Sequence, residues 1–377
     1  MKAVIAGYAR SPFQFARKGE LATTRPDELA AQVVRGLLSR IDLDPGLIED
    51  VILGCSYPEG PQGSNLARIV SLLAGLPNTV AGTTVNRFCG SSMQAIHMAA
   101  ANIEAGMGEA FLCVGVESMS MVPQGGFNPS PNPQLKATSN AYVSMGETAE
   151  NVAARWNVSR WDQEAFAVHS HLKASTARAG GRLHGEIVPI HTPEGALVTE
   201  DGCIRPGTSM EALANLKPAF RADGVVTAGT SSPLTDGAVA VLVTSDTFAE
   251  RHGLAATARI RSFAVAGVAP EIMGVGPIPA TRKALARASL DAGKLGVVEV
   301  NEAFASQALA CMRDLELDPA RTNLDGGGIA IGHPLGATGA RITAKAAALL
   351  QREGQRYALA TQCIGGGQGI ATILERL

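Results

Sequence analysis

The sequence predicts an α/β protein built from a duplicated unit. β-like and helical stretches alternate from the start, with a β-like run at 2–6, a helical pattern at 26–40 and a second β-like run at 51–53. The second half of the chain repeats this order. The run 297–300 resembles 51–53, and in both halves a turn containing a reactive side chain and glycine precedes a helical stretch. Two α/β halves of similar construction are therefore expected.

The remaining elements of the first half follow in order. An Ala-, Leu- and Ile-rich segment lies at 65–75, a short strand is predicted at 83–86, and a helix is predicted at 90–104 because apolar residues recur there at spacings of three or four. An apolar run at 110–115 then predicts a buried strand.

The middle of the chain has a different character. Residues 122–140 are rich in Gly, Pro, Asn and Ser, which favours a long loop, and helical patterns follow at 148–155 and 160–179. From about 238 to 243 an apolar strand resumes the α/β alternation. We therefore interpret residues 118–232 as an insertion.

Three parts are predicted on this basis. The N-terminal half covers residues 1–117 and is completed by about 233–255, the inserted loop domain covers 118–232, and the C-terminal half covers 256–377. In the C-terminal half, the helical stretch 340–350 is expected to lead into a strand at 356–361, as 90–104 leads into 110–115.

Composition excludes several classes of function. The 377 residues carry 32 Lys and Arg against 34 Asp and Glu, and only 4% are aromatic, so no extended basic or base-stacking surface for nucleic acid is expected. No apolar run is long enough to span a membrane. The six cysteines lie far apart without a C-x-x-C pair, which favours free thiols in a cytoplasmic protein and no metal site.

Cys89 is the first candidate for chemistry. It lies between a predicted strand and a predicted helix, where the free N–H groups of a helix N-terminus favour a thiolate over a thiol. A thiol at such a junction can act as a nucleophile. The alternative is that Cys89 fills apolar space, as most buried cysteines do.

His333 is the second candidate. It follows a Gly-rich stretch and precedes Pro334 at the start of a helical pattern, so its side chain projects from a constrained turn. A histidine held there can deprotonate a thiol or donate to an oxyanion. The alternative is a histidine that only caps the helix.

Cys363 is the third candidate, because it stands beside the glycine run that begins near Gly365. A thiol next to exposed backbone N–H groups suits acid/base chemistry beside an oxyanion hole. Asn301, which follows the run 297–300, can hold a water or a carbonyl, although a turn-forming role is the simpler interpretation. The other six histidines are expected on helix surfaces or in loops: His97, His169, His171, His184, His191 and His252.

These motifs, in this order, resemble those of the thiolase family. The matching segments are N-x-x-C-G-S at 86–91, N-E-A-F-A at 301–305, G-H-P-x-G-x-T-G at 332–339 and C-I-G-G-G at 363–367. The similarity extends over essentially the whole chain. It implies a five-layered α-β-α-β-α fold with two duplicated halves and an inserted loop domain that binds coenzyme A.

The resemblance also implies roles for individual residues. Cys89, His333, Cys363 and Asn301 would act in catalysis, together with the N–H of Gly365. Contacts to coenzyme A and its acyl chain are implied for Arg205, Phe220, Ala228, Ser232, Met145 and Phe304. No metal or redox cofactor is expected, because coenzyme A is a substrate.

The implied reaction is that of a 3-ketoacyl-CoA thiolase in fatty acid β-oxidation. Cys89 would take an acyl group from a 3-ketoacyl-CoA, release acetyl-CoA, and pass the acyl group to free coenzyme A. Condensation of two acetyl-CoA molecules to acetoacetyl-CoA is the alternative, but condensing relatives usually have a His where this chain has Ser144. A non-catalytic acyl-CoA or lipid carrier is a second alternative, and retention of both cysteines and His333 argues against it.

The expected partners are small molecules and further copies of the chain. Coenzyme A, acetyl-CoA and 3-ketoacyl-CoA are implied as ligands, and family members form homodimers or homotetramers. A β-oxidation partner subunit is known for some relatives, but no charge run or amphipathic tail in this sequence supports one. Because neither a signal nor a peroxisomal terminus is recognisable, a cytoplasmic location is expected.

Overall fold

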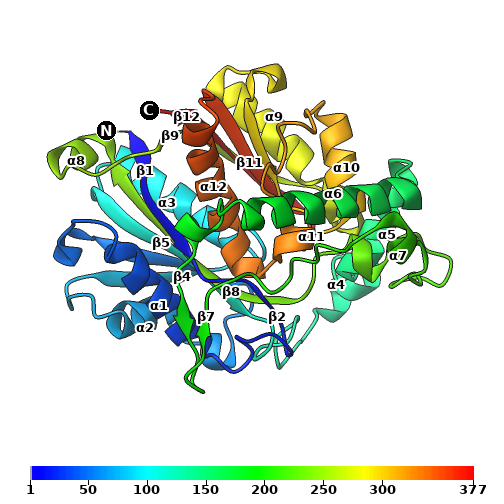
Figure 1. Ribbon diagram of the computed structural model, residues 1–377, viewed down its shortest axis with the longest axis horizontal. Helices are drawn as coiled ribbons and strands as arrows, with labels where there is room; N and C mark the ends of the chain where they lie inside the picture. The colour runs from blue at the N-terminus through cyan, green and yellow to red at the C-terminus, as the bar shows by residue number, and fades with distance from the viewer. Residues whose placement is uncertain (1) are drawn as a thin grey trace.

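The computed structural model describes residues 2–377. In the N-terminal half, five main strands form a mixed parallel and antiparallel part of the sheet (Figure 1). Its strand order is β4-β3-β5-β8-β1, in which β3 is parallel to β4 and β5 while β8 is antiparallel to β5 and β1. A two-residue strand, β2 (Gln14–Phe15), also pairs with β8. The five main strands are β1 (Ala3–Arg10), β3 (Asp50–Gly54), β4 (Ala81–Val85), β5 (Ala110–Ser118) and β8 (Thr235–Ser245).

The C-terminal half repeats this order as β10-β11-β12-β9. Strand β10 is parallel to β11, and β12 is antiparallel to both β11 and β9. In the position that corresponds to β4, a single parallel bridge joins Val298 to Thr322. The strands are β9 (Ala258–Gly267), β10 (Val297–Val300), β11 (Tyr357–Ile364) and β12 (Gln368–Arg376). The predicted duplication is confirmed, and the halves join where β1 pairs with β9.

Helices form three layers around these strands. Helices α1 (Pro26–Leu38) and α2 (Leu66–Leu73) cover the outer face of the N-terminal half. Helices α9 (Pro277–Ala288) and α10 (Ala305–Asp314) cover that of the C-terminal half. Helices α3 (Ser91–Glu104) and α12 (Leu335–Arg352) lie between the two sets of strands, which confirms the predicted five layers.

The central helices α3 and α12 approach closely near their N-termini. A Cβ atom on Gly339 would lie 2.6 Å from the backbone nitrogen of Met93, so only glycine fits there. The N–H of Ala340 donates a hydrogen bond of 2.9 Å to Oγ of Ser92. The two helices therefore begin side by side.

Burial overturns the expectation for two histidines. His97 was expected on a helix surface, but it is buried, stacks on Phe263 at 4.5 Å and lies 2.7 Å from Oγ1 of Thr372 through its Nε2. His171 is also buried. Burial lowers the pKa of His97 to about 3 and that of His171 to about 4, so both rings are neutral at pH 7.

The inserted segment carries its own helices. Side-chain caps from Ser144 and Ser159 begin α5 (Met145–Arg155) and α6 (Arg160–Ala179), and α6 has the predicted bounds. The predicted loop contains a short helix, α4 (Pro133–Thr138), because Asn132 caps it and Pro133 suits its first position. The other elements are β6 (Ile190–His191), β7 (Leu197–Val198) and α7 (Met210–Ala214); α8 (Asp246–Arg251) and α11 (Gly328–Ile331) lie outside the insertion. The bounds of the three parts stay a prediction.

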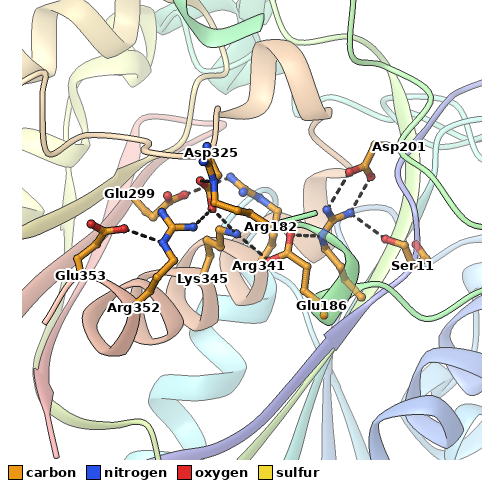
Figure 2. Close-up of polar contacts among 12 residues, drawn as sticks. Ser11, Arg182, Glu186, Asp201, Glu299, Asp325, Arg341, Lys345, Arg352 and Glu353 are labelled. Carbon is orange, nitrogen blue, oxygen red and sulfur yellow. Dashed lines mark hydrogen bonds and ion pairs between the residues drawn. The ribbon is translucent and has the colours of Figure 1, made fainter. Parts of the chain in front are cut away.

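Buried ion pairs attach the insertion to β1 and to α12 (Figure 2). Arg10 of β1 is fully buried and bonds Asp201 at 2.7 Å and Glu186 at 2.8 Å, both from the insertion. Lys345 of α12 lies 3.0 Å from Glu186 and 2.8 Å from Asp325. Burial alone would raise the pKa of Glu186, but Lys345 and Arg10 hold it below its usual value.

Three further arginines complete this network. The partly exposed Arg182 and Arg352 bond Asp325 at 2.9 and 2.6 Å, while the buried Arg341 lies 3.5 Å from Glu299. Burial raises the pKa of Glu299 to about 7 in spite of the opposing charge of Arg341. Among residues 2–377, no helix combines the length and apolar character that crossing a bilayer requires.

We predict that Lys345→Met destabilises the protein by about 3 kcal/mol, because Glu186 and Asp325 lose a buried counter-ion. Urea unfolding measures the change. The matched control is Arg356→Met, whose pairing with Glu375 is exposed and contributes below about 1 kcal/mol. A loss no larger than that of the control would show that the buried network does not depend on Lys345.

Candidate active site

A tight turn between β4 and α3 presents Cys89. Phe88 has a positive φ of 43°, which is unusual for a residue with a side chain. Two side chains hold the turn: Oδ1 of Asn86 accepts from the N–H of Phe88 at 2.8 Å, and Oγ of Ser91 accepts from the N–H of Arg87 at 2.9 Å. The predicted location of Cys89 at a strand–helix junction is confirmed.

The surroundings of Cys89 keep it protonated. Burial raises the pKa of its thiol to about 11, and the carboxylate of Glu117 adds to this effect. The backbone N–H of Gly365 and the N–H of Cys89 itself act in the opposite direction, because they favour a negative charge on the sulfur. Nucleophilic attack by Cys89 therefore requires a base.

His333 is held through both its backbone and its ring. Its backbone N–H donates to Oγ1 of Thr235 at 3.1 Å, and its ring Nδ1 lies 2.6 Å from Oγ1 of Thr338. Because the Thr338 hydroxyl donates to the carbonyl of Pro334 at 3.2 Å, it accepts from the ring. These partners assign the ring proton to Nδ1, so Nε2 is the nitrogen that can accept a proton.

The ring of His333 is neutral at physiological pH. Burial, followed by the positive charge of Arg341, lowers its pKa to about 3. Asn301 lies at the end of β10 with its Nδ2 3.3 Å from Nε2 of His333. The structure thus brings the predicted pair His333 and Asn301 together.

Cys363 lies near the end of β11 in an apolar cluster with Phe304, Met273 and the partly buried Met145. Burial raises the pKa of its thiol well above the usual value, and the nearby sulfur of Cys89 raises it further. Cys363 is therefore a protonated thiol within electrostatic range of Cys89. Such a group can give a proton to a carbanion.

Most of the expected binding residues lie next to this cluster. The ring of Phe220 packs edge-on against Phe304 at 5.9 Å, and the N–H of Ser232 donates to the carbonyl of Ala303 at 2.9 Å. Ala228 begins a short, partly exposed helical turn in the same stretch. These residues line up along the segment that follows Asn301.

Arg205 and Ser144 have different surroundings. Arg205 is exposed and its guanidinium lies over the ring of Phe15 at 5.0 Å. Ser144 caps α5, where its Oγ accepts from the N–H of Glu147 at 3.3 Å. The hydroxyl of Ser144 therefore forms the N-terminal cap of α5.

Comparison with known proteins agrees with this geometry. A family model described as the thiolase N-terminal domain matches residues 3–247, and one described as the thiolase C-terminal domain matches residues 254–376. The chain belongs to the thiolase family. Its relatives include proteins named 3-ketoacyl-CoA thiolase from Bacillus subtilis (strain 168), 45% identical over 99% of both chains, and from Shewanella sp. (strain MR-7), 49% identical over 100% of both.

Several residues that shape this thiolase site were not identified from the sequence. Thr338 orients the ring of His333, and Nε2 of Gln362 donates to the carbonyl of Cys89. The carboxylate of Glu117 raises the pKa of the Cys89 thiol. Thr338 lies within the G-H-P-x-G-x-T-G motif, and Gln362 precedes Cys363, so proximity to the motifs was an available signal. Nothing in the sequence places Glu117 beside Cys89.

We predict that Thr338→Val slows acylation of Cys89 by acetyl-CoA about 10- to 100-fold, because Nδ1–H of His333 loses its acceptor and Nε2 is no longer fixed as the base. Rapid quenching followed by mass spectrometry measures the rate at which the acyl-enzyme forms. Thr343→Val serves as the control, since Thr343 is buried on the same helix and bonds only the backbone of Gly339. Equal losses in the two variants would contradict the role given to Thr338.

Proposed function

We propose that the chain cleaves 3-ketoacyl-CoA with coenzyme A, giving acetyl-CoA and an acyl-CoA shortened by two carbons, as in fatty acid β-oxidation. The observation that carries this proposal is a neutral His333 with an unprotonated Nε2 in a site that also holds two protonated thiols, Cys89 and Cys363. The names of the relatives support the same activity.

The first step forms the acyl-enzyme. Nε2 of His333 takes the proton of Cys89, and the thiolate attacks C3 of the 3-ketoacyl-CoA. The N–H groups of Cys89 and Gly365 stabilise the oxyanion of this tetrahedral species. The bond between C2 and C3 then breaks, and its electrons remain on C2.

The second step completes acetyl-CoA. The departing fragment is an enolate whose oxygen is stabilised by the Nε2–H that His333 has just gained, together with a water held by Asn301. Cys363 protonates C2 and becomes a thiolate. The high pKa of Cys363 suits this step, because the resulting thiolate readily takes a proton back.

The third step releases the product. Free coenzyme A gives its thiol proton to Cys363 and attacks the acyl group on Cys89. The Cys89 thiolate leaves and regains its proton from His333, so both cysteines and the histidine return to their first state. The scheme uses coenzyme A as a substrate and calls on no metal or redox cofactor.

The structure also bears on the condensing alternative. The condensing relatives usually have a histidine where this chain has Ser144, and Ser144 uses its hydroxyl to cap α5. This residue therefore supports degradation over condensation. For the anionic coenzyme A, Arg205 is the proposed local positive charge, because its guanidinium is exposed.

The proposal predicts that both acetoacetyl-CoA and 3-ketohexadecanoyl-CoA are consumed in the presence of coenzyme A. The absorbance of the ketoacyl thioester measures this loss. Cys89→Ala is expected to abolish both activities, because no acyl-enzyme can form. Cys113→Ala, at a buried cysteine of β5, is the control and is expected to retain them. Cleavage of neither substrate by the wild type would overturn the function, and cleavage of the four-carbon substrate alone would overturn the broad chain length.

We further propose that the chain forms a homo-oligomer through β4. This strand pairs with β3 on one side only, Ala81 and Thr83 are exposed, and the neighbouring α2 exposes Leu72 and Leu73. An uncovered edge strand with apolar neighbours favours pairing with a second copy. Cytoplasmic location and a β-oxidation partner subunit stay predictions.

Light scattering is expected to give a mass that is two or four times the 38.9 kDa of one chain. Leu72→Lys combined with Leu73→Lys is expected to lower this mass, because two charges would be buried in the contact. A wild-type mass of one chain at micromolar concentration would contradict the proposal.

A further inference from the structure

Glu117 has no place in the mechanism above, yet it is almost fully buried next to the site. It is the penultimate residue of β5 and is 1% exposed. Its Oε2 accepts from the N–H of Ser56 at 2.8 Å and from the N–H of Gly336 at 2.9 Å. Its Oε1 accepts from Nε2 of Gln62 at 2.9 Å and from the N–H of Tyr57 at 3.2 Å.

These donors come from two segments that are far apart in the sequence. Ser56, Tyr57 and Gln62 belong to the loop after β3, whereas Gly336 lies in the first turn of α12. A Cβ atom on Gly336 would lie 2.8 Å from Oε2 of Glu117, so the glycine allows this approach. One carboxylate therefore joins the N-terminal half to the helix that follows the catalytic histidine.

Each segment leads directly to a reacting group. The carbonyl of Ser56 accepts from Nδ2 of Asn86, and the ring of Tyr57 lies 6.0 Å from that of Phe88, so the loop supports the turn that presents Cys89. Gly336 is three residues beyond His333. Glu117 thus contacts the supports of both members of the catalytic pair.

We propose that Glu117 is a positioning residue that holds the Cys89 turn and the His333 turn in register, with its negative charge held against the loop that supports the Cys89 turn. The proposal rests on the proposed function only in taking Cys89 and His333 as the reacting pair. It assigns Glu117 no contact with substrate.

The partners of Glu117 match an ionised carboxylate. All four donate N–H groups, and a carboxylate is the form that only accepts. Burial raises the pKa of Glu117, but the N–H groups of Ser56 and Gly336 oppose this. The Cys55 thiol, 3.7 Å from Oε1, is the other titratable group against it.

The charge of Glu117 acts on Cys89 from β5. The other titratable groups around this sulfur are Tyr57 from the loop after β3, Cys363 from β11 and, in the proposed mechanism, the neutral His333 that precedes α12. Burial is the largest cause of the raised pKa of Cys89, and the anionic carboxylate of Glu117 raises it further. Removing that charge while keeping its shape should therefore make the thiolate easier to form.

Two variants separate charge from position. Glu117→Gln removes the charge and places an NH₂ group against N–H donors, whereas Glu117→Asp keeps the charge but withdraws it from Gly336 by one methylene. The rate of Cys89 alkylation by iodoacetamide is followed from pH 6 to 10 by peptide mass spectrometry. Because this range lies below the pKa of about 11, a lower pKa appears as faster alkylation at each pH. This readout suits Cys89, which is partly exposed while the other five cysteines are buried.

We expect the alkylation profile of Glu117→Gln to move to lower pH by about half a unit or more, and that of Glu117→Asp to stay at the wild-type pH. Both variants are expected to lower kcat for thiolysis by about 10- to 100-fold, since a displacement of about 1 Å at a reacting pair has effects of this size. KM for coenzyme A is expected to change little, because the binding residues do not contact Glu117.

Glu164→Gln is the matched control, because Glu164 is also a buried glutamate but pairs with Arg160 on α6. It is expected to leave both the alkylation profile and kcat at wild-type values. An unshifted profile in Glu117→Gln, or wild-type kcat in Glu117→Asp, would overturn the proposal. So would failure of both Glu117 variants to give folded protein, since the carboxylate would then serve folding alone.

Alkylation needs no turnover, so a wild type without thiolase activity would reject the proposed function and still leave the alkylation test of Glu117 in force.

Discussion

The structure depends on two helices that begin side by side in its centre. Helices α3 and α12 are enclosed by strands of both halves, and glycines at their contacts allow backbone to meet backbone. Cys89 lies immediately before the first and His333 immediately before the second. Because each half supplies one helix and one reactive residue, the duplication is what brings nucleophile and base together. The positive ends of both helices then face the place where negative charge develops during the reaction.

The same enclosure decides the protonation states in the site. Burial is the first cause of every shift there: it raises the pKa of Cys89 and of Cys363 and lowers that of His333. All three groups are therefore neutral before substrate binds, and no stable ion pair has to be broken when a proton moves. The N–H groups around Cys89 supply stabilisation for the charges that appear briefly. Reacting groups that begin neutral suit chemistry in which a proton passes among sulfur, nitrogen and carbon.

Local patterns predicted what local forces determine. The helix at 160–179 and the strand at 297–300 have the predicted bounds, since caps and apolar runs define them. The strand–helix junction at Cys89 and the turn before α12 that carries His333 were likewise visible from glycine and turn chemistry. His97 was misplaced because a pattern of apolar residues cannot show that a helix is buried on its polar side as well. Glu117 could not be found, since its partners lie 55 to 219 residues away and meet it only in the folded chain.

The two kinds of buried polar contact in this fold differ in what they attach. Around Arg10 and Lys345, opposite charges join the insertion to β1 and α12, and each ion has a counter-ion. Around Glu117, one anion is satisfied by N–H groups and the Cys55 thiol with no cation among residues 2–377 against it, so its net charge remains and acts on Cys89. A neutralised network can fix a domain without disturbing the reacting thiol, whereas an uncompensated carboxylate also changes its acidity. The arrangement therefore separates the attachment of the insertion, which carries most of the expected coenzyme A contacts, from the electrostatics of the catalytic cysteine.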